Sequence, residues 1–240
     1  MEFTSIPLLV LAGGFGTRLK SVVSELPKAL APVDGDPFLR LQIKSWVDQG
    51  IKSFIFLLHH KADLIVEFLN AERDGFLAGC EVKYLIEVSP MGTGGAIAYA
   101  VEKFGIEGNF LVANADTWLS SGVQKMMQAV APSILVLKVT NASRYGAVKF
   151  GDDNFVAAFA EKIMEAKECW INAGLYLLCA NLFEHWDHRE FSLEKIMLPH
   201  LAQQGILRAE PMLVDFIDIG IPEDYRSFCS WVKSGRLNGL

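Results

Sequence analysis

The stretch Ile6-Pro-Leu-Leu-Val-Leu-Ala-Gly-Gly-Phe-Gly-Thr-Arg-Leu-Lys20 contains the pattern that decides the fold. Its apolar run over residues 6–11 predicts a buried strand, and three glycines within four positions follow directly. Glycines let a chain turn tightly and bring backbone N–H groups close to a phosphate, and Arg18 and Lys20 add positive charge beside them. The stretch therefore predicts either a phosphate-binding loop or a plain glycine turn, and these residues alone leave both open.

Two common phosphate-binding patterns are absent from this stretch. The dinucleotide pattern G-x-G-x-x-G fails because Leu19 stands at its last position, and no Gly-Lys-Ser/Thr triplet follows for a P-loop. A nicotinamide-dependent oxidoreductase would also need an acidic residue after the second strand, where His59 and His60 stand. We therefore keep an oxidoreductase only as the weaker alternative.

Strand and helix patterns alternate outward from this stretch. We expect strands at 53–58, 82–86, 110–113 and 134–139, and helices at 38–47, 62–69, 94–104 and 123–130. This alternation predicts an α/β fold with a Rossmann-like, doubly wound mixed sheet, in which ligands bind beyond the carboxyl ends of the strands.

The second half of the chain has a different pattern. We expect a hairpin of strands 146–150 and 155–160, a strand at 170–179, a helix at 193–203 and a short strand at 216–220. A turn of helix is expected from Pro222. The chain is therefore predicted to be one domain, 1–240, with parts of about 1–140 and about 141–240, the latter a small and more antiparallel sub-lobe.

Composition limits the classes of partner. With 51% hydrophobic and 21% charged residues the chain is expected to form a packed core, and its net charge of −6 predicts no general attraction to nucleic acid or anionic membranes. Four dispersed cysteines without a Cys-x-x-Cys pair indicate reduced thiols. The first residues lack the basic start of a signal peptide, and no apolar run reaches 18 residues. These features favour a cytoplasmic protein, and they leave a homo-oligomer open.

Four further positions could bind phosphate, base or metal. Lys28 follows Arg18 by ten residues and can supply a second cation, and Gly92-Thr-Gly-Gly95 predicts a turn open to a flat base or a sugar. Asp116 and Asp218 each end an apolar run, where carboxylates suit Mg²⁺, although each alone is more typical of a helix cap or a turn.

Taken together, seven motifs in this order resemble the sugar-1-phosphate nucleotidyltransferases, also called nucleoside-diphosphate-sugar pyrophosphorylases. They are Leu11-Ala-Gly-Gly-Phe-Gly-Thr-Arg-Leu19, Pro27-Lys28, Gly92-Thr-Gly-Gly95, Asn114-Ala-Asp116, Glu161-Lys162, Asn172-Ala-Gly174 and Phe216-Ile-Asp-Ile-Gly-Ile-Pro-Glu-Asp-Tyr225. Within that family, Arg18-Leu-Lys-Ser-Val-Val23, Ala31-Pro-Val33, Ser143-Arg-Tyr-Gly146 and Phe191-Ser-Leu-Glu-Lys195 most resemble the D-glycero-D-manno-heptose 1-phosphate guanylyltransferases. The resemblance implies a glycosyltransferase-A-like sheet.

The resemblance also implies a reaction. A nucleotidyl group would pass from a nucleoside triphosphate, with GTP favoured, to a sugar 1-phosphate, with D-glycero-D-manno-heptose 1-phosphate favoured, giving a nucleotide-sugar and pyrophosphate for polysaccharide biosynthesis. A relative using another base, or a mannose-, glucose- or MurNAc-1-phosphate, is one alternative, and a non-catalytic nucleotide-sugar sensor is another. The four residues Arg18, Lys28, Asp116 and Asp218 argue against a sensor, because binding alone has little use for all of them.

The resemblance assigns roles residue by residue. The catalytic set is Arg18 on the departing pyrophosphate, Lys28 on the α-phosphate, and Asp116 and Asp218 holding Mg²⁺. The nucleotide would contact Leu11, Ala12, Gly13, Gly14, Gly16, Thr17, Arg18, Lys28, Glu87 and Gly92. The sugar phosphate would contact Thr93, Gly94, Glu161, Lys162, Asn172 and Gly174, on the wall of a cleft opposite the nucleotide.

Elementary chemistry agrees with these roles. A phosphate oxygen attacking a phosphorus is an encounter of anions, so catalysis needs charge neutralisation and alignment more than a general base. The chain departs from the family at Ala115, where Gly is usual, at Ala29, where Pro is common, and after Lys162, where no Pro follows.

Overall fold

The computed structural model describes residues 6–140, 145–160 and 168–237 and groups them in two compact units. The first unit comprises the described residues of Met1–Pro90, Ala113–Ser121 and Asp215–Leu240. The second comprises those of Met91–Val112 and Gly122–Val214. The predicted parts of about 1–140 and 141–240 do not coincide with these units, because 91–112 belongs to the second unit and 215–240 to the first.

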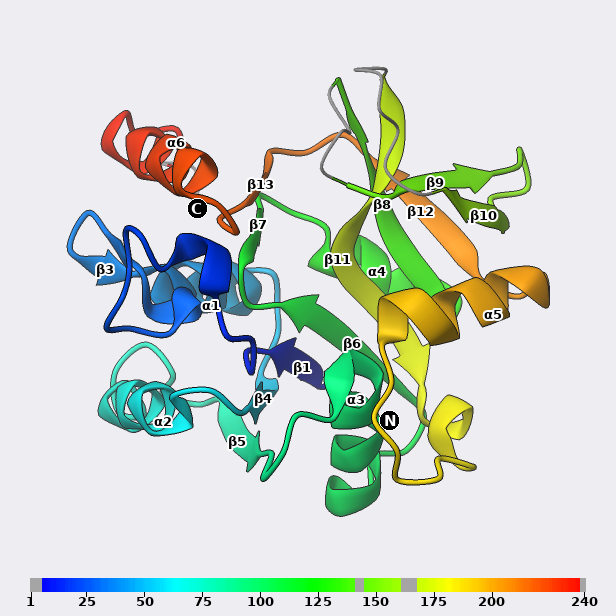
Figure 1. Cartoon of the computed structure of the whole chain (residues 1–240), viewed down its shortest axis with the longest axis horizontal. Coiled ribbons are helices and arrows are strands. Elements are labelled where there is room, and N and C mark those ends of the chain that lie inside the picture. The colour runs from blue at the N-terminus through cyan, green and yellow to red at the C-terminus, as the bar shows by residue number, and fades with distance from the viewer. Residues whose placement is uncertain (1–5, 141–144, 161–167, 238–240) are drawn as a thin grey trace. The chain divides into compact units, whose positions relative to one another are not determined.

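Parallel strands form the centre of the first unit (Figure 1). Strand β1 (Leu8–Leu11) pairs with β4 (Ser53–Leu58), with Leu8 opposite Phe54, and β4 pairs with β5 (Glu81–Ile86), with Ser53 opposite Glu81. All six residues of β4 are buried, which explains its unbroken apolar run, because a central parallel strand is covered on both faces. Helices α1 (Phe38–Asp48) and α2 (Ala62–Ala71) connect these strands, as the sequence predicts.

A two-stranded ribbon brings the end of the chain into the first unit. Strand β7 (Thr117–Leu119) pairs antiparallel with β13 (Phe216–Asp218), so that Asp218 lies opposite Thr117. Trp118 and Ile217 of this ribbon pack in one buried cluster with Phe38 of α1 and Phe228 of α6 (Pro222–Lys233). The same unit contains a short hairpin, β2 (Pro32–Val33) and β3 (Asp36–Pro37), and two single 3₁₀ turns, η1 (Thr17–Leu19) and η2 (Lys28–Leu30).

The second unit is a mainly antiparallel sheet with helices. Strand β8 (Ser133–Val139) pairs antiparallel with β11 (Cys169–Cys179) and parallel with β12 (Arg208–Met212). Strands β9 (Ala147–Phe150) and β10 (Val156–Ala160) form the predicted hairpin, whose turn has Asn154 at a φ of 63°. The helices are α3 (Gly92–Phe104), α4 (Val123–Gln128) and α5 (Leu198–Gln203), with a 3₁₀ turn, η3 (Ala180–Phe183), after β11.

Two features of the second unit differ from the expectation. The predicted helix 193–203 begins as a π-helical turn, η4 (Leu193–Met197), in which the Ser192 hydroxyl accepts from the Lys195 N–H at 3.2 Å. Strand β12 was not predicted, because Arg208-Ala-Glu-Pro-Met212 has neither an apolar run nor a clean alternation.

Strand β6 (Asn109–Asn114) has its first four residues in this unit and its last two in the first unit. Among the described helices, none has both the length and the apolar character to cross a membrane.

Candidate active site

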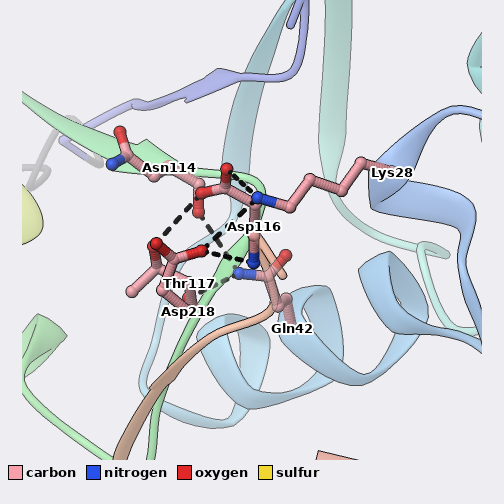
Figure 2. Close-up of polar contacts among 7 residues, drawn as sticks. Lys28, Gln42, Asn114, Asp116, Thr117 and Asp218 are labelled. Carbon is pink, nitrogen blue, oxygen red and sulfur yellow. Dashed lines mark hydrogen bonds and ion pairs between the residues drawn. The ribbon is translucent and has the colours of Figure 1, made fainter. Parts of the chain in front are cut away.

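One ammonium group contacts two carboxylates in the first unit. Lys28 Nζ lies 2.6 Å from Asp116 Oδ2 and 3.4 Å from Asp218 Oδ1. Figure 2 shows the Lys28 side chain reaching toward both acids, of which Asp116 lies in a turn and Asp218 at the end of a strand. The Lys28 side chain is only 12% exposed, so its charge acts at this point and not in bulk water. The structure thus brings together three of the four residues predicted to be catalytic.

Backbone pairing places these three side chains. Lys28 opens the turn η2, and Asp116 lies in the turn between β6 and β7. Asp218 ends β13, and the Ile219 N–H that follows donates to the Asp116 carbonyl at 3.0 Å. The pairing of β7 with β13 therefore fixes the two acids beside each other, although about a hundred residues separate them in the sequence.

The Asp218 carboxyl lies in surroundings that disfavour its negative charge. Burial, together with the negative charge of Asp116, raises the pKa of the Asp218 carboxyl above its usual range. The Lys28 ammonium and the Gly220 N–H, which donates to Asp218 Oδ1 at 2.7 Å, act in the opposite direction. The Lys28 ammonium thus lies where a positive charge is stabilised by two partly buried carboxylates.

This donor set suits Mg²⁺. The ion prefers oxygen ligands and takes one or two carboxylates, completing its shell with phosphate oxygens and water. Asp116 and Asp218 supply those two carboxylates, and the position of the Lys28 ammonium marks the place as one that holds a cation. No group of three or more His, Cys, Asp or Glu side chains arranged for a metal occurs in 6–140, 145–160 and 168–237.

The glycine loop follows β1 in the same unit. The Ala12 N–H donates to the Leu57 carbonyl at 2.9 Å, which extends the pairing of β1 with β4 into the loop. Gly16 has a φ of 58°, and a Cβ added there would lie 3.2 Å from the Lys28 Cβ. The loop therefore passes beside Lys28, as expected of one that presents phosphate to that lysine.

Three loop residues predicted to contact the nucleotide are exposed, and so is Phe15 between them. Gly14, Thr17 and Arg18 are exposed, with Thr17 and Arg18 on η1. A Cβ added at Gly14 would meet no atom within 4 Å, so the protein itself does not require glycine at this position.

Glu87 lies close to the start of the same loop. It follows β5, is buried, and its N–H donates to the Leu58 carbonyl at 2.8 Å. His59 Nδ1 is 3.0 Å from the Glu87 carbonyl, and a Cβ added at Gly13 would lie 3.5 Å from Glu87 Oε1. The structure thus groups Glu87 with the predicted nucleotide-binding residues of the first unit.

The second glycine turn, Gly92–Gly95, packs against its own unit. The N–H groups of Gly94 and Gly95 donate to the Phe191 carbonyl at 3.0 and 3.3 Å. A Cβ added at Gly94 would lie 2.1 Å from the Phe191 ring. The expectation that this turn is open to a base or a sugar is therefore wrong for the side that Phe191 covers.

Thr93 is held by the segment that carries Phe191. Its hydroxyl donates to Glu194 Oε2 at 2.6 Å and accepts from the Leu193 N–H at 2.8 Å. The predicted contacts of Gly92, Thr93 and Gly94 with substrate stay predictions.

Asn172 and Gly174 lie together on β11. Asn172 Oδ1 accepts from the Gly174 N–H at 3.0 Å, and Asn172 Nδ2 donates to the Tyr176 hydroxyl at 2.9 Å. Gly174 has a φ of 73°, and the pairing of β11 with β8 shifts register between Asn172 and Tyr176. This irregularity explains why a glycine occupies position 174.

The other two residues predicted to contact the sugar phosphate, Glu161 and Lys162, lie outside the described residues.

Two further residues contact the carboxylate pair or its turn and are not predicted as site residues from the sequence. A Cβ added at Gly220 would lie 2.8 Å from Asp218 Oδ1 and 3.1 Å from Lys28 Nζ, so glycine makes room for both groups. Gln42 of α1 is buried and donates to the backbone of the turn that carries Asp116. A polar residue within the apolar face of a predicted helix was the available indication for Gln42.

Comparisons with known proteins agree with this geometry. Residues 8–232 match the family described as Nucleotidyl transferase. The chain is 37% identical over 224 residues to the D-glycero-alpha-D-manno-heptose 1-phosphate guanylyltransferase of Campylobacter jejuni, covering 92% of this chain and 97% of that one. It is also 37% identical to the enzyme of the same name from Aneurinibacillus thermoaerophilus, covering 91% and 94%.

Solved structures give the same picture. The crystal structure of HddC from Yersinia pseudotuberculosis, complexed with GMP-PN, matches with a TM-score of 0.84 and 33% identity, covering 95% of this chain and 99% of that one. An inositol-1-phosphate CTP transferase from T. maritima, 18% identical with a TM-score of 0.75 and 96% and 97% coverage, shares the fold. These likenesses confirm the predicted mixed α/β fold, and the chain belongs to the Nucleotidyl transferase family.

Proposed function

We propose that this enzyme transfers a guanylyl group from GTP to D-glycero-α-D-manno-heptose 1-phosphate. The observation that carries the proposal is the single ammonium of Lys28 between Asp116 and Asp218, a site built to manage phosphate charge. The names of the relatives from Campylobacter and Aneurinibacillus support the sugar, and the GMP-PN complex of the Yersinia protein supports the base.

The proposed chemistry requires no protein nucleophile. A phosphate oxygen of the sugar 1-phosphate attacks the α-phosphorus of GTP, the bond from that phosphorus to the bridging oxygen breaks, and pyrophosphate leaves. A phosphate monoester has its second pKa near about 6, so the attacking oxygen is already ionised at neutral pH. The protein therefore has to bring anions together and neutralise the charge that reaches the leaving oxygen.

Lys28 is suited to that task. Its ammonium is a compact charge on a mostly buried stem, and the neighbouring glycine loop would deliver the triphosphate to it. Asp116 and Asp218 would hold Mg²⁺, which when bound neutralises and aligns the reacting phosphates. With the acids so occupied, Lys28 would be free to contact the α-phosphate, and the exposed Arg18 would contact the departing pyrophosphate.

The remaining roles follow the resemblance and complete the proposal. The nucleotide would be positioned by Glu87 and Gly92 and by the loop residues Leu11, Ala12, Gly13, Gly14, Gly16 and Thr17. The sugar phosphate would contact Thr93, Gly94, Glu161, Lys162, Asn172 and Gly174.

A substrate grid tests the function. Five nucleoside triphosphates are combined with the 1-phosphates of D-glycero-D-manno-heptose, mannose, glucose and MurNAc, and pyrophosphate release is measured with Mg²⁺ present. We expect the highest kcat/KM for GTP with the heptose 1-phosphate. A higher value for another pair would reassign the substrates, and nucleotide binding without pyrophosphate release from any pair would identify a sensor.

A further inference from the structure

Gln42 is a polar side chain in an apolar place. It lies on the face of α1 that also buries Phe38, Leu39, Ile43 and Trp46, and it is itself only 2% exposed. Its Nε2 donates to the Thr117 carbonyl at 2.7 Å and to the Asn114 carbonyl at 3.3 Å. Both protons of the amide group are therefore directed at the turn between β6 and β7.

That turn carries Asp116, and Gln42 binds it on either side of the acid. Two other bonds hold the residues in between, because the Ala115 N–H donates to the Leu11 carbonyl at 3.1 Å and the Asp116 carbonyl accepts from the Ile219 N–H at 3.0 Å. Figure 2 shows the Gln42 amide beside Asn114, Thr117 and the two acids.

The two oxygens of the Asp116 carboxylate have separate partners. Oδ2 contacts Lys28, and Oδ1 accepts from the Thr117 hydroxyl at 3.2 Å. Among the described residues, Gln42 bonds to the backbone that carries this carboxylate and not to the carboxylate itself, so its effect on Asp116 must pass through the turn.

Packing alone does not explain an amide at this position. Gln42 Oε1 is buried and has no hydrogen-bond partner within the described residues. A buried acceptor without a partner is unfavourable, and an apolar side chain of similar size would avoid it. The amide is explained by its two hydrogen bonds to the Asn114 and Thr117 carbonyls.

We propose that Gln42 is a positioning residue that fixes the turn Asn114–Thr117 so that Asp116 faces its cation. This inference rests on the proposed function, in which Asp116 is a ligand of Mg²⁺. A displacement of about 1 Å at a reacting group can cost about a hundredfold in rate, so a clamp on both sides of one acid has a direct kinetic effect.

The experiment replaces the amide by an apolar side chain of similar volume. Gln42→Leu should lower kcat by about tenfold or more and raise the Mg²⁺ concentration for half-maximal rate by a similar factor. GTP affinity without metal should stay within about twofold. Gln49→Leu is the control. Gln49, the residue directly after α1, also donates from its side chain to a backbone carbonyl, that of Ser45 at 3.2 Å, and its replacement should leave kcat and the Mg²⁺ dependence unchanged. Unchanged values in Gln42→Leu would overturn the proposal.

A double-mutant cycle separates positioning from general stability. In an Asp116→Asn background, Gln42→Leu should change the residual rate by less than about twofold, while it lowers the melting temperature as much as in the native background. An equal loss of rate in both backgrounds would show a merely structural role.

The cycle also keeps the two proposals apart. Absence of pyrophosphate release by the native protein with GTP and the heptose 1-phosphate would refute the proposed function, and full activity in Asp116→Asn would refute the metal-binding role of Asp116. An inactive Asp116→Asn beside a normal Gln42→Leu would refute only the role of Gln42. If Gln42→Leu does not fold, the unbranched Gln42→Met replaces it with the same expectations. Failure of both variants to fold would make Gln42 a structural residue and overturn the proposal.

Discussion

At the scale of single residues, Lys28 is a cation that two partly buried acids share. Burial and the charge of Asp116 both raise the pKa of the Asp218 carboxyl. Such a carboxylate is a cost to the fold at neutral pH, and a bound cation offsets that cost. The negative charge of Asp218 therefore favours cation binding but lowers the stability of the metal-free protein.

We predict opposite effects of Asp218→Asn on activity and stability. Loss of one preorganised electrostatic group should lower kcat by about a hundredfold or more. Without metal at pH 7, the melting temperature should rise, because the neutral amide removes a buried charge and can still accept from the Gly220 N–H. Pyrophosphate release and thermal unfolding measure the two effects.

The pH dependence gives this prediction its sign. A raised pKa means that the folded protein binds the Asp218 proton more tightly than the unfolded chain does. The stability from that proton is complete below the unfolded pKa and is lost as pH rises through the folded pKa. The advantage of the variant should therefore shrink as pH falls through that range, and added Mg²⁺ should stabilise only the native protein. A variant less stable than the native protein at pH 7 would contradict this.

Gly220 gives a second prediction at this scale. Gly220→Ala would bring a methyl group to 2.8 Å from Asp218 Oδ1 and 3.1 Å from Lys28 Nζ, and both groups would have to move. Because these are ends of side chains, the fold can adapt, so we expect kcat to fall by about tenfold or more while the melting temperature changes little. Gly79→Ala is not an equal control, since its φ is positive, and Gly14→Ala serves better in the unfolding measurement.

Residues of this site differ in how well the sequence alone could predict them. Lys28, Asp116 and Asp218 were predicted because they end apolar runs or follow Pro within family motifs, and the structure brings them together. Gln42 was not, because only the folded packing of α1 against the turn reveals which carbonyls its amide reaches. Side-chain contacts across 75 positions are set by tertiary structure and not by local pattern.

At the scale of elements, the glycine loop contains two glycines with different needs. Gly16 has the left-handed φ that disfavours other residues, whereas Gly14 has an ordinary φ and open space around it. Any need for glycine at position 14 would therefore come from the ligand.

These two glycines make a matched pair of variants. Gly16→Ala should lower the melting temperature and weaken GTP binding together. Gly14→Ala should leave the melting temperature unchanged and weaken only the triphosphate, by about tenfold, if backbone approaches phosphate there. Calorimetric titration with GTP and with guanosine distinguishes a phosphate contact from a base contact. If Gly14→Ala binds GTP with native affinity, the backbone at position 14 does not contact phosphate, and this part of the loop is a plain turn.

Most elements were predictable, and the exceptions have physical reasons. The strands with unbroken apolar runs, β1, β4 and β8, agree with the expected ranges within two residues. Strands β7 and β12 were missed, because one has three residues and the other contains Arg, Glu and Pro. Their strand form comes from the partners β13 and β8, which a local pattern does not contain. The sequence predicts open backbone at Gly92–Gly95, whereas Phe191 covers one side of these glycines.

At the scale of the whole molecule, the reaction needs two substrates with separate recognition. Lys162 is the proposed contact of the sugar phosphate. Lys162→Ala should raise the KM for the sugar 1-phosphate by about tenfold or more, on the scale of about 1.5–3 kcal/mol for a hydrogen bond to a charged group. GTP affinity measured without sugar should stay the same.

Lys149→Ala offers a comparison for Lys162→Ala, since Lys149 lies on β9 and has no proposed role. It should leave both substrate constants unchanged. An unaltered sugar KM in Lys162→Ala would make that lysine a surface charge, and weaker GTP binding would move it to the nucleotide.

The order of segments along the chain also bears on how such an enzyme can acquire a new sugar. The second unit is encoded in two pieces, Met91–Val112 and Gly122–Val214, and the piece between them, Ala113–Ser121, contains Asp116. A recombination event that exchanges the gene segment for residues 91–214 would import the donor's Asp116 turn along with the residues proposed to contact the sugar phosphate. Lys28, Gln42 and Asp218 would stay with the recipient. Such an exchange can therefore transfer a new sugar preference only if the imported turn fits the Lys28, Gln42 and Asp218 side chains of the recipient.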